Sequence, residues 1–182
     1  LWHSLEPKKI KDDVKSVVIG GPDCSQPYAA SYLNISAMSF GSLSSNAVEA
    51  LNLGAQKAGC YHNTGEGSVS PYHLKHGGDI VWQIGTGLFG CRDEQGSFCS
   101  TSFKEMATKP EVKMIEIKLS QGAKPGHGGV LPKAKITQEI ADIRHIPITE
   151  DCISPAVNPE CRTPLTLLSF IQQLRTLSTG KP

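Results

Sequence analysis

Apolar residues along the 182-residue chain fall into short runs that alternate with longer segments of helical spacing. A short, mostly apolar run is typical of a buried strand, and apolar positions every three or four residues are typical of a helix. Three runs are predicted to be core strands, at residues 32–38, 60–63 and 112–119. A β-prone run at residues 16–19 precedes them and is closed by a Gly-Gly-Pro turn.

The first predicted helix follows the first of these core strands. Asn46 and Glu49 fit a capping box, and Ser44 is an alternative N-cap. Valine, leucine and alanine residues then recur at helical spacing and form one apolar face. Gly59 is predicted to end the helix, because glycine readily takes the left-handed conformation that follows many helices.

Three further helices are predicted downstream. Ser102 and Glu105 fit a second capping box before a short helix that Pro110 ends. Isoleucines at helical spacing mark another helix in residues 135–144. The clearest helix lies in residues 163–180, with a threonine N-cap, a proline at its first position, a strong leucine stripe and a closing glycine.

A glycine-rich stretch in the middle of the chain admits two interpretations. Residues 80–84 and 88–91 resemble the arms of a β-hairpin. Residues 85–90 also match the dinucleotide-binding pattern G-x-G-x-x-G. That site requires a helix to begin at the glycines, whereas the turn-like residues 91–96 follow here. We therefore predict the hairpin and reject the dinucleotide site.

The alternation of strands and helices predicts an α/β fold with a parallel sheet covered by helices. A closed TIM barrel has eight strands and typically about 250 residues, but only about three core strands are predicted here. Residues 145–162 are predicted to be irregular, and the chain ends just after a helix that needs a sheet to cover. We therefore expect a lead-in segment at residues 1–33, followed by the N-terminal half of a (β/α)8 barrel at residues 34–182, in a truncated chain.

Composition excludes several classes of protein. A hydrophobic fraction of 38% and a charged fraction of 19% are typical of a folded globular protein. The formal net charge of +1 gives no reason to expect nucleic acid or a membrane surface as a partner. Segment 1–13 carries charged residues where a signal peptide would need an apolar core, so no signal peptide is expected there.

Cysteine usage points to a reducing compartment. The chain has six widely spaced cysteines without any C-x-x-C motif: Cys24, Cys60, Cys91, Cys99, Cys152 and Cys161. Free thiols and a cytoplasmic location are expected, with a Cys91–Cys99 pair or half-site for a metal as the weaker alternative. The histidines show no metal-ligand spacing, so no metal site is predicted.

The strand at residues 112–119 carries candidate chemistry. Ile115 and Ile117 share the face suited to the helices, which leaves Glu116 and Lys118 inside the barrel. Lys118 is the nearer to the carboxyl end of the strand, where the active sites of such barrels lie. An inward lysine needs a partner or an anion. An ion pair inside the barrel and a ligand-binding role are both open from this feature alone.

Two loops follow predicted strands. Residues 120–132 contain four glycines, two prolines and Lys124, which suits a phosphate or carboxylate, although the Gly-Lys-Ser/Thr of a P-loop is absent. A flexible surface loop with solvated lysines is the alternative to a binding or lid loop. Glu66, in the turn after residues 60–63, should lie at the same end of the barrel. It could be a base, a positioning group or a solvated turn residue.

Three stretches, in this order, resemble the central FMN domain of glutamate synthases. They are residues 37–44 (AMSFGSLS), 63–67 (NTGEG) and 118–132 (KLSQGAKPGHGGVLP). The opening stretch is similar to that of the stand-alone FMN-binding glutamate synthase-like proteins, which lack the amidotransferase domain. The resemblance implies a (β/α) barrel that holds FMN over 2-iminoglutarate, formed from 2-oxoglutarate and ammonia. Reduced flavin passes a hydride to the imine, and L-glutamate is the product.

The resemblance also implies roles for individual residues. The residues expected beside the flavin are Ala37, Met38, Ser39 and Lys118. The residues expected to bind the substrate are Glu66, Gln121, Lys124 and Arg144. Two of these eight, Lys118 and Glu66, are expected to be catalytic. Lys118, Lys124 and Glu66 are also the residues that the strand and loop patterns select independently.

Two departures from the family pattern widen the choice of substrate. His127 stands where the family commonly has Glu, and Val130 stands where it commonly has Gln. Another oxo or imino acid is therefore an alternative substrate. The family's FMN-phosphate strands and iron–sulfur cysteines are expected downstream of Pro182, and an electron donor and a source of ammonia are expected partners. A non-catalytic fragment that cannot bind flavin alone is the third hypothesis.

Overall fold

The computed structural model describes residue 6 and residues 16–182. The expectation that segment 1–13 is not a signal peptide falls almost entirely outside these residues. A three-stranded parallel sheet occupies the centre of the fold, in the order β3-β4-β5. Its strands are β3 (His62–Asn63), β4 (Ile80–Ile84) and β5 (Val112–Ile117).

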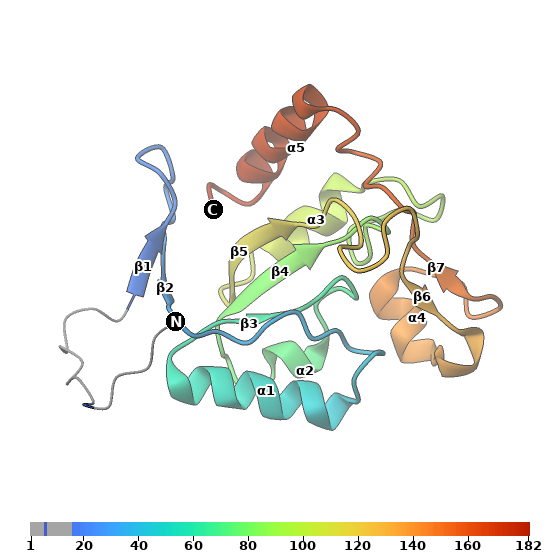
Figure 1. The fold of residues 1–182 in the computed structure, drawn as a ribbon, viewed down its shortest axis with the longest axis horizontal. Coiled ribbons are helices and arrows are strands. Elements are labelled where there is room, and N and C mark those ends of the chain that lie inside the picture. Colours follow the sequence, from blue (N-terminus) through green and yellow to red (C-terminus); the bar gives the residue numbers. More distant parts are fainter. Residues whose placement is uncertain (1–5, 7–15) are drawn as a thin grey trace.

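Parallel pairing in chain order confirms the mixed α/β class and the parallel sheet (Figure 1). Consecutive parallel neighbours need crossover connections, and α3 (Ser100–Ala107) lies in the connection between β4 and β5. The closed barrel stays a prediction, because the described residues form an open sheet of three strands.

The predicted hairpin around residues 85–87 is wrong. Residues 80–84 form the central strand β4, whose partners are β3 on one side and β5 on the other. Residues 88–91 form tight turns instead of a return strand, and Leu88 has a positive φ of 52°. All five residues of β4 are buried. A strand covered on both faces is apolar at nearly every position, here all but Gln83, so its sequence pattern could not identify its partner strands.

The structure confirms the reason for rejecting a dinucleotide site, which is that no helix opens at the glycines. No helix begins at residues 85–90, and the next helix in the chain is α3, which starts at Ser100. The segment between them folds as turns, with one antiparallel bridge between Arg92 and Phe98.

The predicted core strand at residues 32–38 is also wrong. The nearby strand is β2 (Tyr28–Ser31), which pairs with β1 (Ser16–Ile19) in an antiparallel hairpin, so the β-prone run at 16–19 is confirmed. Residues 32–38 make only one bridge to β3, between Ile35 and His62. Tyr32 is 64% exposed and Leu33 is 83% exposed. The segment supplies backbone hydrogen bonds at the edge of β3 without burying its apolar side chains.

Five α-helices are described: α1 (Ser45–Ala58), α2 (Pro71–Leu74), α3, α4 (Gln138–Arg144) and α5 (Pro164–Leu177). Helix α1 begins at the alternative cap, because Ser44 Oγ accepts a hydrogen bond from Ala47 N, and the capping box at Asn46 is wrong. Gly59 ends α1 in the left-handed conformation, as predicted. Figure 1 shows α1 and α2 beside β3, and α3 and α5 on the β5 side.

The other helix boundaries agree in part with the sequence. Cys99, not Ser102, is the N-cap of α3, and Ser102 lies inside the helix with its hydroxyl bonded to the Cys99 thiol. Thr163 caps α5 as predicted, with its hydroxyl accepting from Thr166 N. Helix α5 ends before Gly180, whose N–H still reaches the carbonyl of Arg175.

One small sheet lies in a region predicted to be irregular. Strand β6 (Val130–Leu131) pairs antiparallel with β7 (Cys152–Ile153), and the 3-10 helix η1 (Lys133–Lys135) follows β6. Two residues per strand leave too short a run for a sequence pattern. This pairing brings the glycine-rich loop against residues 152–154.

Two apolar clusters stabilise the fold. The first joins β4, α3 and α5, and Trp82 stacks on Phe103 with ring centroids 5.3 Å apart. Ile115 and Ile117 pack against this cluster, which confirms the side of β5 predicted to face the helices. The second cluster includes Phe40, Val48, Phe89 and Ile140 and lies beside β6 and β7.

The six cysteines all lie in the described residues, and all are free thiols. Burial differs among them, with Cys60, Cys91 and Cys152 buried. Among the described helices, none is long and apolar enough to cross a membrane.

Candidate functional site

Polar side chains gather where β3 and β5 end. The Lys118 ammonium lies 3.2 Å from Glu66 Oε2 and donates to Gln121 Oε1 at 3.1 Å. The Gln121 amide nitrogen lies 2.9 and 2.8 Å from the two carboxylate oxygens of Glu66. These contacts join the ends of the two strands into one network. They confirm that Glu66 and Lys118 lie at the same end of the sheet.

A second polar group lies on the face of the sheet opposite the helices. Glu116 Oε1 accepts from Asn63 Nδ2 at 3.1 Å and from the side-chain amide of Gln83. These three residues come from β5, β3 and β4 in turn. Glu116 therefore projects away from Ile115 and Ile117, as the alternation along β5 predicts. In the structure Lys118 pairs with Glu66, which follows β3, and not with Glu116.

A cavity of about 190 Å³ opens beside this network. Its walls come from the ends of β3 and β5, the glycine-rich loop, α4 and the β6–β7 sheet. The lining residues are Ser39, Ser42, Glu66, Phe89, Gln121, Lys124, Gly129, Val130, Leu131, Arg144, Cys152 and Ser154.

The cavity brings together most of the residues that the resemblance selects. Ser39, Glu66, Gln121, Lys124 and Arg144 all line it. They lie far apart in the sequence, so their convergence is a property of the fold.

Three selected residues lie outside the lining. Lys118 does not line the cavity, but it contacts two residues that do, Glu66 and Gln121. Ala37 and Met38 belong to the segment that leads to Ser39. Of the two departures from the family pattern, Val130 lines the cavity and His127 does not.

Arg144 is the most deeply buried charge at the site. The residue is 5% exposed, and Nη2 donates to the Phe40 carbonyl at 3.0 Å. Its guanidinium lies 5.4 Å from the ring centroid of Phe89. Among the described residues, no carboxylate pairs with it, and its buried Nε has no acceptor. A buried cation of this kind is suited to bind an anion.

Glycines make room for the two charged groups. A Cβ at Gly67 would lie 2.8 Å from Arg144 Nη2. A Cβ at Gly85 would lie 2.6 Å from Glu66 Cβ, and one at Gly129 would lie 2.6 Å from Glu66 Oε1. Real Cβ atoms do not approach so closely, so a side chain at any of these three positions would displace Arg144 or Glu66.

Sequence reasoning missed Phe89, Cys152 and Ser154. Ser154 Oγ accepts from Gly129 N at 2.8 Å and so holds the glycine-rich loop against β7. Burial raises the pKa of the Cys152 thiol, and the neighbouring Arg144 guanidinium offsets part of this rise. These residues reach the cavity through the β6–β7 pairing and the turns after β4, which left no motif in the sequence.

A buried histidine supports the segment before Ser39. His73 is fully buried in α2, and its Nε2 lies 3.0 Å from the Met38 carbonyl oxygen. Met38 N donates to the carbonyl of Asn63 at 3.0 Å. Both backbone groups of Met38 are therefore held. Among the described residues, no group of three or more His, Cys, Asp or Glu side chains is placed to hold a metal ion.

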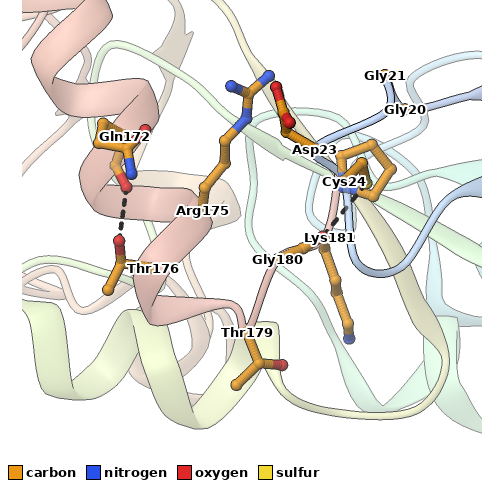
Figure 2. Close-up of a pocket in the computed structure, with 11 residues that line it drawn as sticks. Gly20, Gly21, Asp23, Cys24, Gln172, Arg175, Thr176, Thr179, Gly180 and Lys181 are labelled. Carbon is orange, nitrogen blue, oxygen red and sulfur yellow. Dashed lines mark hydrogen bonds between the residues drawn. The ribbon is translucent and has the colours of Figure 1, made fainter.

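A larger hollow, of about 530 Å³, lies apart from these residues. It separates the turn after β1 from the end of α5, as Figure 2 shows with Asp23, Cys24 and Arg175. The Cys24 thiol donates to the Gly180 carbonyl at 3.3 Å across it. It contains none of the residues selected from the sequence.

The protein is thus an α/β protein with a small cavity at the carboxyl ends of its parallel strands, lined by two cations and one carboxylate. A family described as the conserved region in glutamate synthase matches residues 5–182. The chain therefore belongs to the glutamate synthase family. This finding confirms the family resemblance of the three sequence stretches.

Individual relatives agree with the family. The chain is 45% identical over 166 residues, 90% of its length, to the glutamate synthase large subunit-like protein YerD of Bacillus subtilis. It is 37% identical over 120 residues, 66% of its length, to the archaeal-type glutamate synthase [NADPH] of Thermotoga maritima. It is 31% identical over 177 residues, 97% of its length, to a glutamate synthase large subunit-like protein of Rhizobium meliloti. The chain spans 31%, 21% and 37% of these proteins, respectively.

Proposed function

We propose that this chain is the part of an FMN-dependent oxidoreductase of glutamate synthase type that binds the oxo acid and the flavin ring. The proposed reaction is the reductive amination of 2-oxoglutarate, through 2-iminoglutarate, to L-glutamate. In this proposal residues 34–182 are the N-terminal half of a (β/α)8 barrel, and residues 1–33 lead into it. The iron–sulfur cluster, the electron donor and the ammonia source belong to the complete protein.

The observation that carries the proposal is the charge of the cavity. Glu66 is paired with Lys118. Lys124 and Arg144 also line the cavity, and neither has a carboxylate partner among the described residues. Two unpaired cations in one small cavity suit a ligand with two carboxylates, such as 2-oxoglutarate. Arginine can bind a carboxylate through two parallel hydrogen bonds, and lysine acts as a point charge.

The residues near Ser39 fit the ring of FMN. Among the described residues, the Ser39 N–H has no acceptor, and a glycine, Gly65, lies beside it. Lys118 provides a cation next to the same cavity. These donors suit the oxygen and nitrogen acceptors of a flavin ring. When bound, FMN would supply the hydride that reduces the imine.

Each polar residue then has a defined task. Arg144 and Lys124 hold the two carboxylates, and Gln121 donates to the same ligand. Glu66 fixes the Lys118 ammonium at the end of β5. There Lys118 can stabilise negative charge on the substrate and donate a proton to the imine nitrogen.

Substitution of Lys124 tests the proposal in the natural protein that contains this chain. Lys124→Ala should raise KM for 2-oxoglutarate about tenfold or more, since a hydrogen bond to a charged group contributes roughly 1.5–3 kcal/mol. The Kd for FMN should stay unchanged. Lys135→Ala is the matched control, because Lys135 is exposed and lies outside the cavity. Equal weakening of substrate and FMN would contradict the assigned role.

Val130 favours a second candidate function. It places an apolar side chain in the cavity wall at a position where the family commonly has Gln. A related FMN oxidoreductase that acts on another oxo or imino acid is therefore the alternative. Comparing kcat/KM for 2-oxoglutarate with that for oxo acids bearing an apolar side chain distinguishes the two. Preference for the apolar acids, reversed by Val130→Gln, would support the alternative.

A visible absorption spectrum separates both enzymatic proposals from a non-catalytic role. Flavin bands in the natural protein, purified without oxygen, would support an FMN enzyme. Their absence in the isolated 182-residue chain would indicate that residues elsewhere complete the flavin site. A natural protein without flavin bands would contradict the proposed function.

A further inference from the structure

His73 is a buried side chain that the proposed reaction does not use directly. It lies in the short helix α2, and both of its ring nitrogens have partners. Nδ1 lies 3.1 Å from the Ser70 backbone nitrogen and 2.8 Å from Ser70 Oγ. A backbone N–H can only donate, so Nδ1 must be an acceptor and the ring proton must lie on Nε2.

The proton on Nε2 determines what His73 does to Met38. Nε2–H donates to the Met38 carbonyl at 3.0 Å. Burial lowers the pKa of His73 to about 4, so the ring is neutral near pH 7 and keeps this arrangement. The His62 ring lies beside it, tilted by 46° with ring centroids 5.1 Å apart, and burial lowers the pKa of His62 as well. Neither ring therefore carries a charge near pH 7.

The geometry of the peptide bond extends the effect of His73 to Ser39. No cis peptide bond is present in the described residues, so the peptide between Met38 and Ser39 is trans. In a planar trans peptide the C=O and the next N–H point in opposite directions. His73 draws the Met38 carbonyl toward α2, and the Ser39 N–H therefore points away from α2. Ser39 itself lines the cavity.

The Ser39 N–H is free to serve a ligand. Among the described residues it has no hydrogen-bond acceptor. A Cβ at Gly65 would lie 3.1 Å from Ser39 N, so glycine at this position keeps a side chain from crowding that nitrogen. A backbone donor with a fixed direction and no acceptor in the described residues, on a residue that lines a cavity, is suited to bind an acceptor atom of a ligand.

We propose that His73 is a positioning residue, which holds the Met38 carbonyl so that the Ser39 N–H is presented to an acceptor atom of the flavin ring. The inference rests on the proposed function, because it assigns the free donor to FMN. His73 does not contact the flavin itself. Its role is to fix one peptide plane through a single neutral tautomer.

Two substitutions of His73 test its contact with Ser70 and its contact with Met38 one at a time. His73→Asn keeps an acceptor near the position of Nδ1 but has no donor that reaches Met38. His73→Gln keeps a donor near the position of Nε2. In the natural protein, His73→Asn should weaken FMN binding about tenfold and lower the reduction potential of the flavin, since a hydrogen bond to the ring is lost. His73→Gln should stay within about threefold of the unsubstituted protein. His76→Asn is the control, because the polar partner of His76 in the described part of the chain is Glu49 and not Met38.

A measurement without flavin tests the tautomer directly. The ¹⁵N chemical shifts of the His73 ring, measured in the natural protein after its flavin has been removed, should report a neutral ring with the proton on Nε2. A proton on Nδ1 would overturn the inference whatever the flavin does, and this result does not require any variant to fold. If the natural protein binds FMN and His73→Asn leaves affinity and potential unchanged, the inference alone is wrong. If the natural protein binds no FMN, the proposed function fails first, and the role of His73 fails with it.

Discussion

Arg144 is a buried guanidinium without a carboxylate partner among the described residues. A buried charge costs free energy unless it is paired, and its hydrogen bond to Phe40 and its contact with Phe89 offset only part of that cost. Residues kept for binding often lower the stability of a protein. Arg144 is therefore expected to contribute to ligand binding and not to net stability.

Arg144→Met tests this division. In the natural protein the substitution should raise KM for a dicarboxylate about 100-fold, because loss of one partner of a buried charge pair costs roughly 2–5 kcal/mol. In the 182-residue chain the free energy of unfolding, measured with urea, should stay equal or rise. The exposed Arg162, replaced by Met, is the control. A loss of more than about 2 kcal/mol of stability at Arg144 would identify it as a structural residue.

His62 predicts how stability depends on pH. Its side chain is fully buried, neither ring nitrogen has a partner among the described residues, and burial lowers its pKa to about 4. The unfolded chain takes up this proton near pH 6.5, before the folded protein does. The stability that the neutral ring maintains is therefore complete above pH 6.5 and is lost as the pH falls toward 4.

Replacement of His62 by Leu should reduce this pH dependence. Each buried neutral histidine adds a slope of up to about 1.4 kcal/mol per pH unit, and His73 should retain its own share in the variant. Urea unfolding between pH 7 and pH 5 measures the slope. The exposed His127, replaced by Leu, should leave the slope unchanged. An identical slope in the His62→Leu variant would mean that the ring is protonated normally in the folded protein.

At the scale of the single element, the start of α1 depends on one hydroxyl group, that of Ser44. Both Ser44 and Asn46 are plausible caps in the sequence, and only Ser44 accepts the hydrogen bond from Ala47 N. Ser44→Ala should lower the free energy of unfolding by about 0.5–2 kcal/mol, the usual cost of a lost N-cap. Asn46→Ala should change it little, because Asn46 lies exposed inside the helix. The opposite ranking in urea unfolding would show that the capping box forms in solution.

Elements with local signals were predictable, and those that depend on distant partners were not. Thr163 and Gly59 mark helix ends through their own chemistry, and the alternation along β5 placed Glu116 and Lys118 correctly. Strand β4 is buried on both faces and apolar except for Gln83, so nothing in its sequence distinguished a central parallel strand from a hairpin arm. The tight turns at residues 88–91 gave the same apolar pattern as a short strand.

The candidate site follows the same division. Glu66 and Lys124 could be selected because each follows a predicted strand, and Lys118 because it faces inward near the end of one. The family resemblance added Gln121 and Arg144. Cys152 and Ser154 could not be selected, since they reach the cavity only through the pairing of β6 with β7. That pairing joins residues about twenty positions apart through two short strands, and no local propensity encodes it.

At the scale of the whole molecule, the two apolar clusters stabilise different regions of the fold. The first cluster surrounds the central strand β4, and the second lies beneath the cavity, beside α4, β6 and β7. The cavity therefore rests on a smaller set of packed residues than the sheet does. Regions with fewer buried contacts open at lower free energy than the core, and ligand-binding segments are commonly among them.

Substitutions in the two clusters should therefore destabilise different sets of elements. Phe103, fully buried and stacked on Trp82, supports the sheet, and Phe103→Ala should cost about 3–5 kcal/mol and speed amide exchange throughout β4 and β5. Ile140, 5% exposed, supports the second cluster. Ile140→Ala should speed exchange in α4, β6 and β7 while β4 keeps its protection. Leu168→Ala, at a position 62% exposed, should alter neither region. If Ile140→Ala speeds exchange in β4 as much as in β7, the clusters unfold as one unit, and the cavity cannot open while the sheet stays folded.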